Sequence, residues 1–253
     1  MLEILILSLV QGITEFLPIS SSSHIILFSK FMNFISEDLI LNVSLHIGSF
    51  LAVVVFFRVE ILSFFTYRKI FMLVVISSLP IILCGYLISQ TGIINDLRSL
   101  KIIGWTTVIF GFLLYFSDRR GNEKSLEINF DFKSAIVIGV LHIFSLIPGV
   151  SRSGIAITAA RFLKFDRVNA ARISFLLSIP TLLAVTVFGI YKLYMTDNFD
   201  VIKLNFGSIF LSFIFSYITI VAFLGYIKKA SLDVFVLYRI VLGSIILIFA
   251  YLG

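Results

Sequence analysis

The sequence is poor in charged residues, cysteine and proline. Only 13% of its 253 residues are charged, whereas 59% are hydrophobic and 28 are phenylalanine. An ordinary soluble domain is about half apolar and about a quarter charged. One core of this size cannot bury so much apolar surface, so the composition predicts an integral membrane protein rather than a soluble enzyme.

The other scarcities exclude further classes. The single cysteine, Cys84, lies in an apolar run, so no intramolecular disulfide can form and a structural zinc cluster lacks its ligands. The formal net charge is +6, but the basic residues form no dense patch, and we expect no nucleic-acid partner. The first residues carry no basic segment or small-residue cleavage pattern, so we expect mature sequence rather than a removed signal peptide.

Apolar runs divide the chain into predicted membrane segments. A bilayer-spanning helix needs about 20 residues. Six runs predict simple spans, at residues 40–57, 70–89, 102–116, 172–191, 206–227 and 235–252. Two more runs, residues 2–29 and 134–162, are interrupted by turn-forming residues at 18–23 and 148–154. The pieces are short for a bilayer core of about 30 Å, so we expect each run to enter and leave the membrane on the same side.

The distribution of basic residues favours this topology. With both interrupted runs re-entrant, five of the 20 lysines and arginines lie on the side of the N-terminus, fourteen lie on the other side, and Arg152 lies within the membrane. With both runs spanning, the division is almost even. Because lysine and arginine accumulate on the cytoplasmic side, we expect both termini to lie outside. The fourteen include Arg161 and Arg239.

The two halves of the chain resemble each other at an offset of 131 to 132 residues. Residues 10–23 align without gaps on residues 141–154. Each half, 1–120 and 132–253, then holds one re-entrant helix–loop–helix and three transmembrane helices, and an odd number of spans gives the halves opposite orientations. We therefore predict an all-α integral membrane protein, one polytopic domain of two inverted-topology repeats. Such repeats place a site where broken helices meet, so the two loop tips should face each other.

Two charged residues stand out in the interrupted runs. An arginine deep in a membrane segment is costly and is functional by default, which singles out Arg152. Glu15 is the matching carboxylate in the other run, and Gln11 lies four residues earlier on the same helical face. Together with phosphate oxygens, Glu15 and Gln11 suit Mg²⁺ or Ca²⁺. The alternative is an Arg152–Glu15 ion pair that only fastens the two halves together.

Serines and restarting helices at both tips predict an anion site. Helices restart at about His24 and about Gly154, and free N–H groups at helix starts favour phosphate. An arginine fork binds two phosphate oxygens. The expected phosphate-binding residues are Ser20, Ser22, Ser151, Ser153 and Gly154. Helix capping is the alternative role for these serines.

A histidine near the first serine cluster suggests nucleophilic chemistry. His24 lies three residues after Ser21, so a helix that starts near Ser21 places both on one face. His24 there could take the serine proton or protonate a leaving phosphate. The alternative is a buried histidine satisfied by a backbone carbonyl, which we favour for His46 and His142.

At these residues the sequence resembles the bacterial undecaprenyl-diphosphate phosphatases of the bacitracin-resistance type. Residues 11–21, QGITEFLPISS, match the first signature of that family, with His24 at its histidine. Residues 148–154, PGVSRSG, match the second signature, and residues 46–58 and 172–180 resemble further family blocks. The resemblance covers nearly the whole chain.

Three positions depart from the pattern of that family. Gln11 stands where the family usually has a glutamate, which argues against a metal site with two carboxylates. Ala156 stands at a position usually occupied by threonine, and His142 at one that is commonly glutamine. The glutamate, histidine and arginine of the signatures are all kept.

The resemblance implies an enzyme of the bacterial inner membrane. It would hydrolyse undecaprenyl diphosphate to undecaprenyl phosphate and inorganic phosphate, recycle this lipid carrier for cell-wall polymer synthesis and confer bacitracin resistance. It would need a divalent cation, and its site would open to the outer face. By position, the resemblance implies Glu15 as the essential carboxylate, Ser21 as the nucleophile, His24 as its acid–base partner and Arg152 as the diphosphate clamp. Direct attack by water, with Ser21 only as a ligand, is an alternative.

A secondary transporter or lipid flippase is the alternative from another class. Inverted repeats and broken helices are typical of transporters, whereas a combination of serine, glutamate, histidine and arginine favours hydrolysis. The protein's other expected partners are the lipid bilayer and a second copy of itself in a homodimer. Four glycines fit either packing within the chain or a dimer face, namely Gly104, Gly111, Gly225 and Gly243.

Overall fold

The protein is a bundle of helices in the computed structural model, which describes residues 2–32, 39–64, 68–91, 93–121, 124–195 and 206–252. Six helices in these ranges are long and apolar enough to cross a membrane. They are α3 (Leu39–Phe56), α5 (Arg68–Thr91), α7 (Leu100–Asp118), α11 (Arg167–Met195), α12 (Phe206–Ile227) and α13 (Asp233–Leu252). They coincide with the six predicted spans, which are therefore confirmed.

The long helices keep large apolar side chains on their outward faces. One exposed example from each of the six is Leu51, Leu83, Ile109, Val187, Ile218 and Ile248. So much exposed apolar surface is unusual for a monomer in water and is expected for helices that face lipid. Three short helices lie between longer ones, namely α4 (Arg58–Ser63), α6 (Ile93–Asp96) and α8 (Leu126–Asn129).

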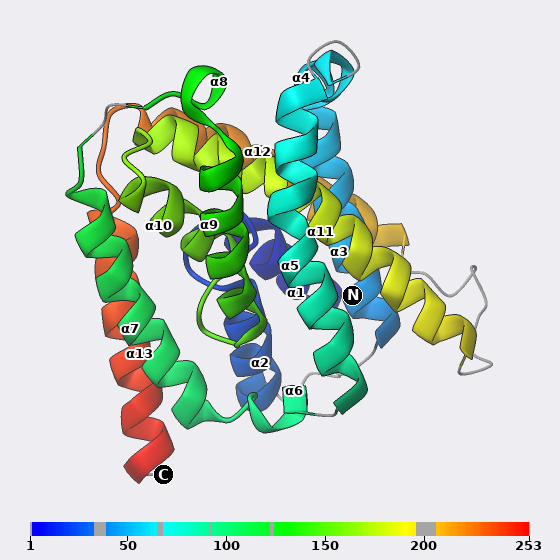
Figure 1. Cartoon of the computed structure of the whole chain (residues 1–253). Coiled ribbons are helices and arrows are strands. Elements are labelled where there is room, and N and C mark those ends of the chain that lie inside the picture. The colour runs from blue at the N-terminus through cyan, green and yellow to red at the C-terminus, as the bar shows by residue number, and fades with distance from the viewer. Residues whose placement is uncertain are drawn as a thin grey trace.

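The two interrupted runs form helix–loop–helix units, as predicted. The first consists of α1 (Leu2–Thr14) and α2 (Ser21–Met32), and the second of α9 (Phe132–His142), the 3₁₀ helix η1 (Ile143–Leu146) and α10 (Arg152–Phe162). In Figure 1, α2 runs toward the end of the bundle that holds α6, whereas α9 starts at the opposite end, near α8. We call the connections before α2 and α10, together with the first residues of these helices, the first tip (residues 15–23) and the second tip (residues 147–154).

The two tips share one unusual backbone conformation. Ser20 and Ser151 both have φ of 73°, a left-handed value that few residues other than glycine adopt. Each serine directly precedes its helix, and the two are related by the sequence offset of 131. The Ser151 hydroxyl caps α10 by accepting a hydrogen bond from the Gly154 backbone N–H at 3.0 Å. The predicted alternative role of this serine, helix capping, is therefore confirmed.

In both halves, the first helix of the helix–loop–helix unit packs against a long helix of the other half. Helix α1 packs against α12, and α9 packs against α5, which holds the matching place in the first half. Glycines make both approaches close. A Cβ atom on Gly12 would lie 2.4 Å from the Phe215 Cβ, and one on Gly139 would lie 2.6 Å from the Ser77 carbonyl oxygen. Each helix–loop–helix unit is thus wedged against a span of the other half.

Helices α7 and α13 lie side by side along one edge of the bundle (Figure 1). A Cβ on Gly104 would lie 2.7 Å from Leu247, and one on Gly243 would lie 2.6 Å from Val108. Gly111 likewise faces Arg239 at 3.2 Å. These three glycines therefore pack within the chain.

Two of the arginines that were counted on the cytoplasmic side are fully buried within the bundle. Arg161 and Arg239 each have no exposed surface. Arg161 lies beside Asp118, and Arg239 lies between the two tips. The count had only the position of each residue along an apolar run, which does not show how the helices pack.

Candidate functional site

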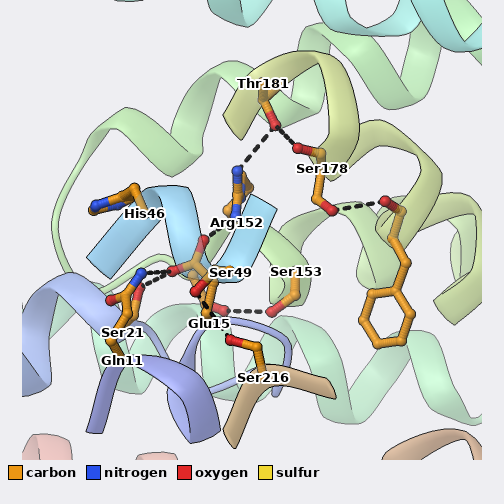
Figure 2. A network of polar contacts seen from close by, with 12 residues as sticks. Gln11, Glu15, Ser21, His46, Ser49, Arg152, Ser153, Ser178, Thr181 and Ser216 are labelled. Atoms are coloured by element: carbon orange, nitrogen blue, oxygen red, sulfur yellow. Dashed lines mark hydrogen bonds and ion pairs between the residues drawn. The ribbon is translucent and has the colours of Figure 1, made fainter. Parts of the chain in front are cut away.

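The two tips meet through Glu15 and Arg152. The Arg152 Nη2 atom pairs with the Glu15 Oε1 atom, and the two side chains are 17% and 5% exposed. Figure 2 shows this pair within a network of polar side chains. The predicted meeting of the tips is confirmed. Removing one partner of so buried a pair leaves an uncompensated charge, which is strongly unfavourable.

The second oxygen of Glu15 collects donors from its own half. Ser21 Oγ donates to Glu15 Oε2 at 2.6 Å, and Gln11 Nε2 donates to the same atom at 3.0 Å. Gln11 is placed there because it lies one helical turn before Glu15, as the spacing predicted. The carboxylate therefore joins the predicted nucleophile to the predicted arginine clamp.

Helix α11 supplies a support that the sequence did not single out. Arg152 Nη1 donates to Thr181 Oγ1 at 3.0 Å, and the Thr181 hydroxyl in turn donates to the Leu177 carbonyl at 2.9 Å. Thr181 directly follows Pro180, which lies inside α11. The guanidinium fork is thus held on one side by Glu15 and on the other by Thr181 (Figure 2).

The hydroxyls of the remaining serines at the tips have partners within the protein. Ser153 Oγ donates to the Leu17 carbonyl of the first tip at 2.7 Å, and Ser151 Oγ lies 3.3 Å from Ser153 Oγ. Ser20 is buried and lies 3.0 Å from Ser23, oxygen to oxygen. The Ser153–Leu17 contact joins the two tips, whereas the other two contacts each lie within a single tip. Phosphate binding by these serines stays a prediction.

The accessible side chains of the site lie at the starts of α2 and α10. Ser22 is exposed and Ser21 and Arg152 are partly exposed, whereas Glu15 and His24 are buried. The Gly154 backbone N–H, by contrast, is already used by the helix cap. A ligand would therefore reach the tips past Ser21 and Ser22.

His24 contacts a residue that the sequence analysis missed. Its Nδ1 atom lies 2.7 Å from the Ser20 carbonyl, and its Nε2 atom lies 2.6 Å from the Tyr238 hydroxyl. A carbonyl only accepts, so Nδ1 carries the proton and Nε2 of a neutral ring accepts from Tyr238. The helix starts at Ser21 as the prediction required, but Ser21 hydrogen-bonds to Glu15 and not to His24.

The two other histidines differ from each other. His46 Nδ1 lies 2.8 Å from the Asn42 carbonyl, which confirms the expected backbone partner. Figure 2 places His46 near the Glu15–Arg152 pair. The same expectation was wrong for His142, because both of its ring nitrogens are buried without a hydrogen-bond partner. His142 is the last residue of α9, and η1 begins at the next residue.

Arg239 connects the tips through a hydrogen bond to a backbone carbonyl in each of them. Its Nη1 donates to the Pro18 carbonyl of the first tip at 3.1 Å, and its Nη2 donates to the Gly149 carbonyl of the second tip at 2.8 Å. Its Nε donates to the Thr107 carbonyl of α7 at 3.2 Å. A signal for this residue was present, because Arg239 lies in an apolar span just as Arg152 does.

The donor set of the site suits a hard divalent cation. Gln11 Oε1 is buried and has no hydrogen-bond partner, and it belongs to the side chain that contacts Glu15. A carboxylate, an amide oxygen and serine hydroxyls are oxygen donors of the kind that Mg²⁺ and Ca²⁺ prefer. In the described ranges, no three side chains of histidine, cysteine, aspartate or glutamate form a group that could hold a metal. The residues therefore fit an ion that is shared with a phosphate ligand.

Known proteins resemble this chain over almost its full length. Residues 4–245 match the family described as Bacitracin resistance protein BacA. The chain is 48% identical to an undecaprenyl-diphosphatase of Pelagibacter ubique (strain HTCC1062) over 251 residues, which cover 99% of this chain and 98% of that protein. It is 37% identical to an undecaprenyl-diphosphatase of Jannaschia sp. (strain CCS1), over 97% of both chains. The chain is therefore a multi-pass membrane protein that belongs to the Bacitracin resistance protein BacA family.

Proposed function

We propose that this protein hydrolyses undecaprenyl diphosphate to undecaprenyl phosphate and inorganic phosphate. The observation that carries the proposal is the chain of contacts from Ser21 through Glu15 to Arg152, which joins a hydroxyl, a base and an anion-binding fork at the two tips. The relatives named undecaprenyl-diphosphatase give the substrate class. Regenerating the lipid carrier for cell-wall polymers, and bacitracin resistance, follow from this activity and from the family.

Binding begins with the charge of the diphosphate. Arg152 offers a fork for two oxygens, and α2 and α10 both begin at the tips, where helix starts favour anions. Phosphoryl transfer depends mainly on positioning and on stabilising charge over the equatorial oxygens. Since Glu15 occupies Arg152 in this structure, a bound phosphate would share or replace that contact and leave the carboxylate free to act as a base.

Ser21 is the nucleophile in this proposal. Its hydroxyl donates to Glu15 Oε2 at 2.6 Å, so Glu15 is the base that the geometry favours. The Ser21 oxygen would bond to the terminal phosphorus while the bond from that phosphorus to the bridging oxygen breaks, and undecaprenyl phosphate would leave. Water would then hydrolyse the phosphoserine. His24 stays the predicted second acid–base residue, and its Nε2 atom would act once it is released from Tyr238.

A divalent cation, Mg²⁺ or Ca²⁺, is part of the proposal. Glu15 and the unpartnered oxygen of Gln11 are the residues that would hold it. When bound, the ion would neutralise charge on the phosphate oxygens.

We also infer the topology of two inverted repeats, with both termini outside the bacterial inner membrane and the site open to the outer face. The matching φ of Ser20 and Ser151 supports the repeat, as does the exchanged packing of α1 on α12 and α9 on α5. The excess of basic residues in loops of one side supports the orientation.

The test is phosphate release from undecaprenyl diphosphate by purified protein in detergent, with Mg²⁺ or Ca²⁺. Detergent holds no gradient, so a transporter or flippase without hydrolytic activity would release nothing. We expect release by the wild type and loss of release in Arg152→Ala and Glu15→Ala. Release that persists in both variants, or absence of release by folded wild type across several cations and prenyl lengths, would contradict the proposal.

The nucleophile is tested separately. We expect Ser21→Ala to abolish turnover and wild-type protein quenched during turnover to carry phosphate on Ser21. Near-wild-type turnover of Ser21→Ala would instead favour direct attack by water.

A further inference from the structure

Arg239 makes the same contact with both tips. It donates to the carbonyls of Pro18 and Gly149, and these residues are related by the offset of 131 that relates the two halves. Each carbonyl lies two residues before the serine with the left-handed backbone, Ser20 or Ser151. One side chain thus binds equivalent points of two loops that lie far apart in the sequence.

The charge of Arg239 is buried without a counter-charge. Its side chain has no exposed surface, and no carboxylate in the described ranges forms an ion pair with it. Burying an arginine in this way is unfavourable unless its donors are satisfied. Three carbonyls from α7 and both tips satisfy them, and hydrogen bonds from a charged donor are stronger than neutral ones. This unfavourable burial of a charge occurs between the two tips.

The packing leaves the guanidinium little freedom. A Cβ atom on Gly154 would lie 2.8 Å from Arg239 Nη1, so the first turn of α10 packs directly against the Arg239 guanidinium. Arg152 is the first residue of that turn. A displacement of Arg239 would therefore move Arg152 relative to Glu15.

We propose that Arg239 is a positioning residue that sets the separation of the two tips and so aligns Ser21 and Glu15 with Arg152. The inference rests on the proposed hydrolysis of a lipid diphosphate. Arg239 does not contact the predicted nucleophile or its base, and it acts through the Pro18 and Gly149 carbonyls. A lysine keeps the charge but cannot reproduce a planar fork with three separate acceptors.

The first experiment compares Arg239→Lys and Arg239→Met with Arg161→Lys. Arg161 is the matched control, because it is also fully buried and donates to backbone carbonyls, but at the Asp118 end of α10. We expect kcat of both Arg239 variants to fall by about 10- to 100-fold, as for a misplacement of about 1 Å. The KM should stay within about threefold of the wild-type value, because Arg152, whose guanidinium would bind phosphate, is unchanged. Arg161→Lys should unfold more easily and keep the kcat of its folded fraction.

Hydrogen exchange gives a readout that does not need activity. We expect peptides over residues 15–24 and 146–155 to exchange faster together in Arg239→Lys, while the rest of the chain keeps wild-type protection. In Arg161→Lys the faster peptides should instead cover residues 118–121 and 161–167. Wild-type exchange at both tips in Arg239→Lys would overturn the inference, whether or not the wild type hydrolyses the lipid. Wild-type kcat in Arg239→Lys beside an active wild type would also overturn it.

Gly154→Ala serves if the Arg239 variants fail to fold. Its new methyl group would lie 2.8 Å from Arg239 Nη1 and 3.0 Å from the Ser151 side chain, so it would press on both without removing the arginine. We expect the same joint increase of exchange in both tips. An increase confined to the second tip would show that Arg239 does not couple the two, and would overturn the inference.

Discussion

Two fully buried arginines join distant segments of this chain, but only one of them has a carboxylate partner. At the end of α10, Arg161 Nε lies 3.3 Å from Asp118 Oδ1, and its Nη2 donates to the Asp118 carbonyl. At the tips, Arg239 has only backbone carbonyls as partners. The carboxylate at the tips, Glu15, pairs with Arg152 and not with Arg239.

The two regions also differ in the donors that surround their carboxylates. Asp118 is 1% exposed and accepts two hydrogen bonds from Arg167, at 2.8 and 2.9 Å, and one from the Leu232 backbone N–H at 3.1 Å. Glu15 is also buried, but it accepts a hydrogen bond from the hydroxyl of the partly exposed Ser21. The comparison teaches that a carboxylate held by arginines and a backbone N–H fastens helices, whereas a carboxylate that also binds a serine hydroxyl can take part in a reaction. Changing one carboxylate at a time can test this division.

The largest effect on turnover is expected for Glu15→Gln. The amide keeps the shape but cannot take the Ser21 proton or neutralise Arg152. We expect kcat to fall by about 10²- to 10⁴-fold, the usual contribution of a general base. Phosphate release by purified protein checks this, with thermal unfolding as the control for folding. Turnover within about tenfold of wild type would remove Glu15 from the chemistry.

The largest effect on stability is expected for Asp118→Asn. The change leaves Arg161 buried without its carboxylate, which typically costs about 3–5 kcal/mol. The free energy of unfolding in detergent measures it, and kcat of the folded fraction should stay unchanged. Asp233→Asn is the matched control, because its pair with Arg119 is about half exposed and should contribute less than about 1 kcal/mol. A loss of kcat with intact stability would mean that the two regions do not differ as described.

A smaller effect is expected for Thr181→Val. This change keeps the side-chain shape and removes the hydroxyl that accepts from Arg152 at 3.0 Å. Losing one hydrogen bond to a charged group should lower kcat/KM by about tenfold. Thr219→Val is the control, since the Thr219 hydroxyl donates to the Phe215 carbonyl on the same helix and contacts no site residue. Equal effects of the two variants would show that Thr181 does not support the clamp.

The smallest effect concerns a carboxylate that belongs to neither region. Asp131 caps α9, and its hydrogen bonds from Ser134 hold the pKa of the Asp131 carboxyl below its ordinary value. A lowered folded pKa contributes stability above the ordinary carboxyl pKa of about 3.9, and that stability is lost as the pH falls through the folded value. Asp131→Ala should lower the free energy of unfolding near neutral pH by about 1 kcal/mol.

Asp131→Asn separates the cap from the charge. Asparagine also caps helices but does not titrate. We expect the difference between wild type and Asp131→Asn to shrink as the pH is lowered below about 3.9. Unfolding curves over a pH series measure it, and a difference that grows at low pH would contradict the sign.

Most of the fold could be predicted from the sequence because the signals lie within single segments. Apolar run length gave the six spans, and proline, glycine and serine marked both tips. The Glu15–Arg152 contact followed from a charged residue at or beside the interruption of each run. The repeat offset supplied the reason that the tips should meet.

The contacts supplied by α11 and α13 could not be predicted in the same way. Thr181 and Tyr238 look like ordinary residues of apolar spans, and their roles depend on which helix packs behind which tip. Arg239 carried a visible signal, but its place near one end of a span led to its being counted with the cytoplasmic side. The position of a residue along a run does not show how far the tips reach toward it.

The contacts that join the two tips bring together residues from both halves of the sequence. Glu15 reaches Arg152, the Leu17 carbonyl reaches Ser153, and Arg239 holds Pro18. Both halves contain a helix–loop–helix unit, but Glu15 and Ser21 come only from the first half and Arg152 only from the second. In genetic terms, neither half could supply function alone. If the chain were cut between residues 120 and 132, the fragments should restore activity only when both are expressed in one cell.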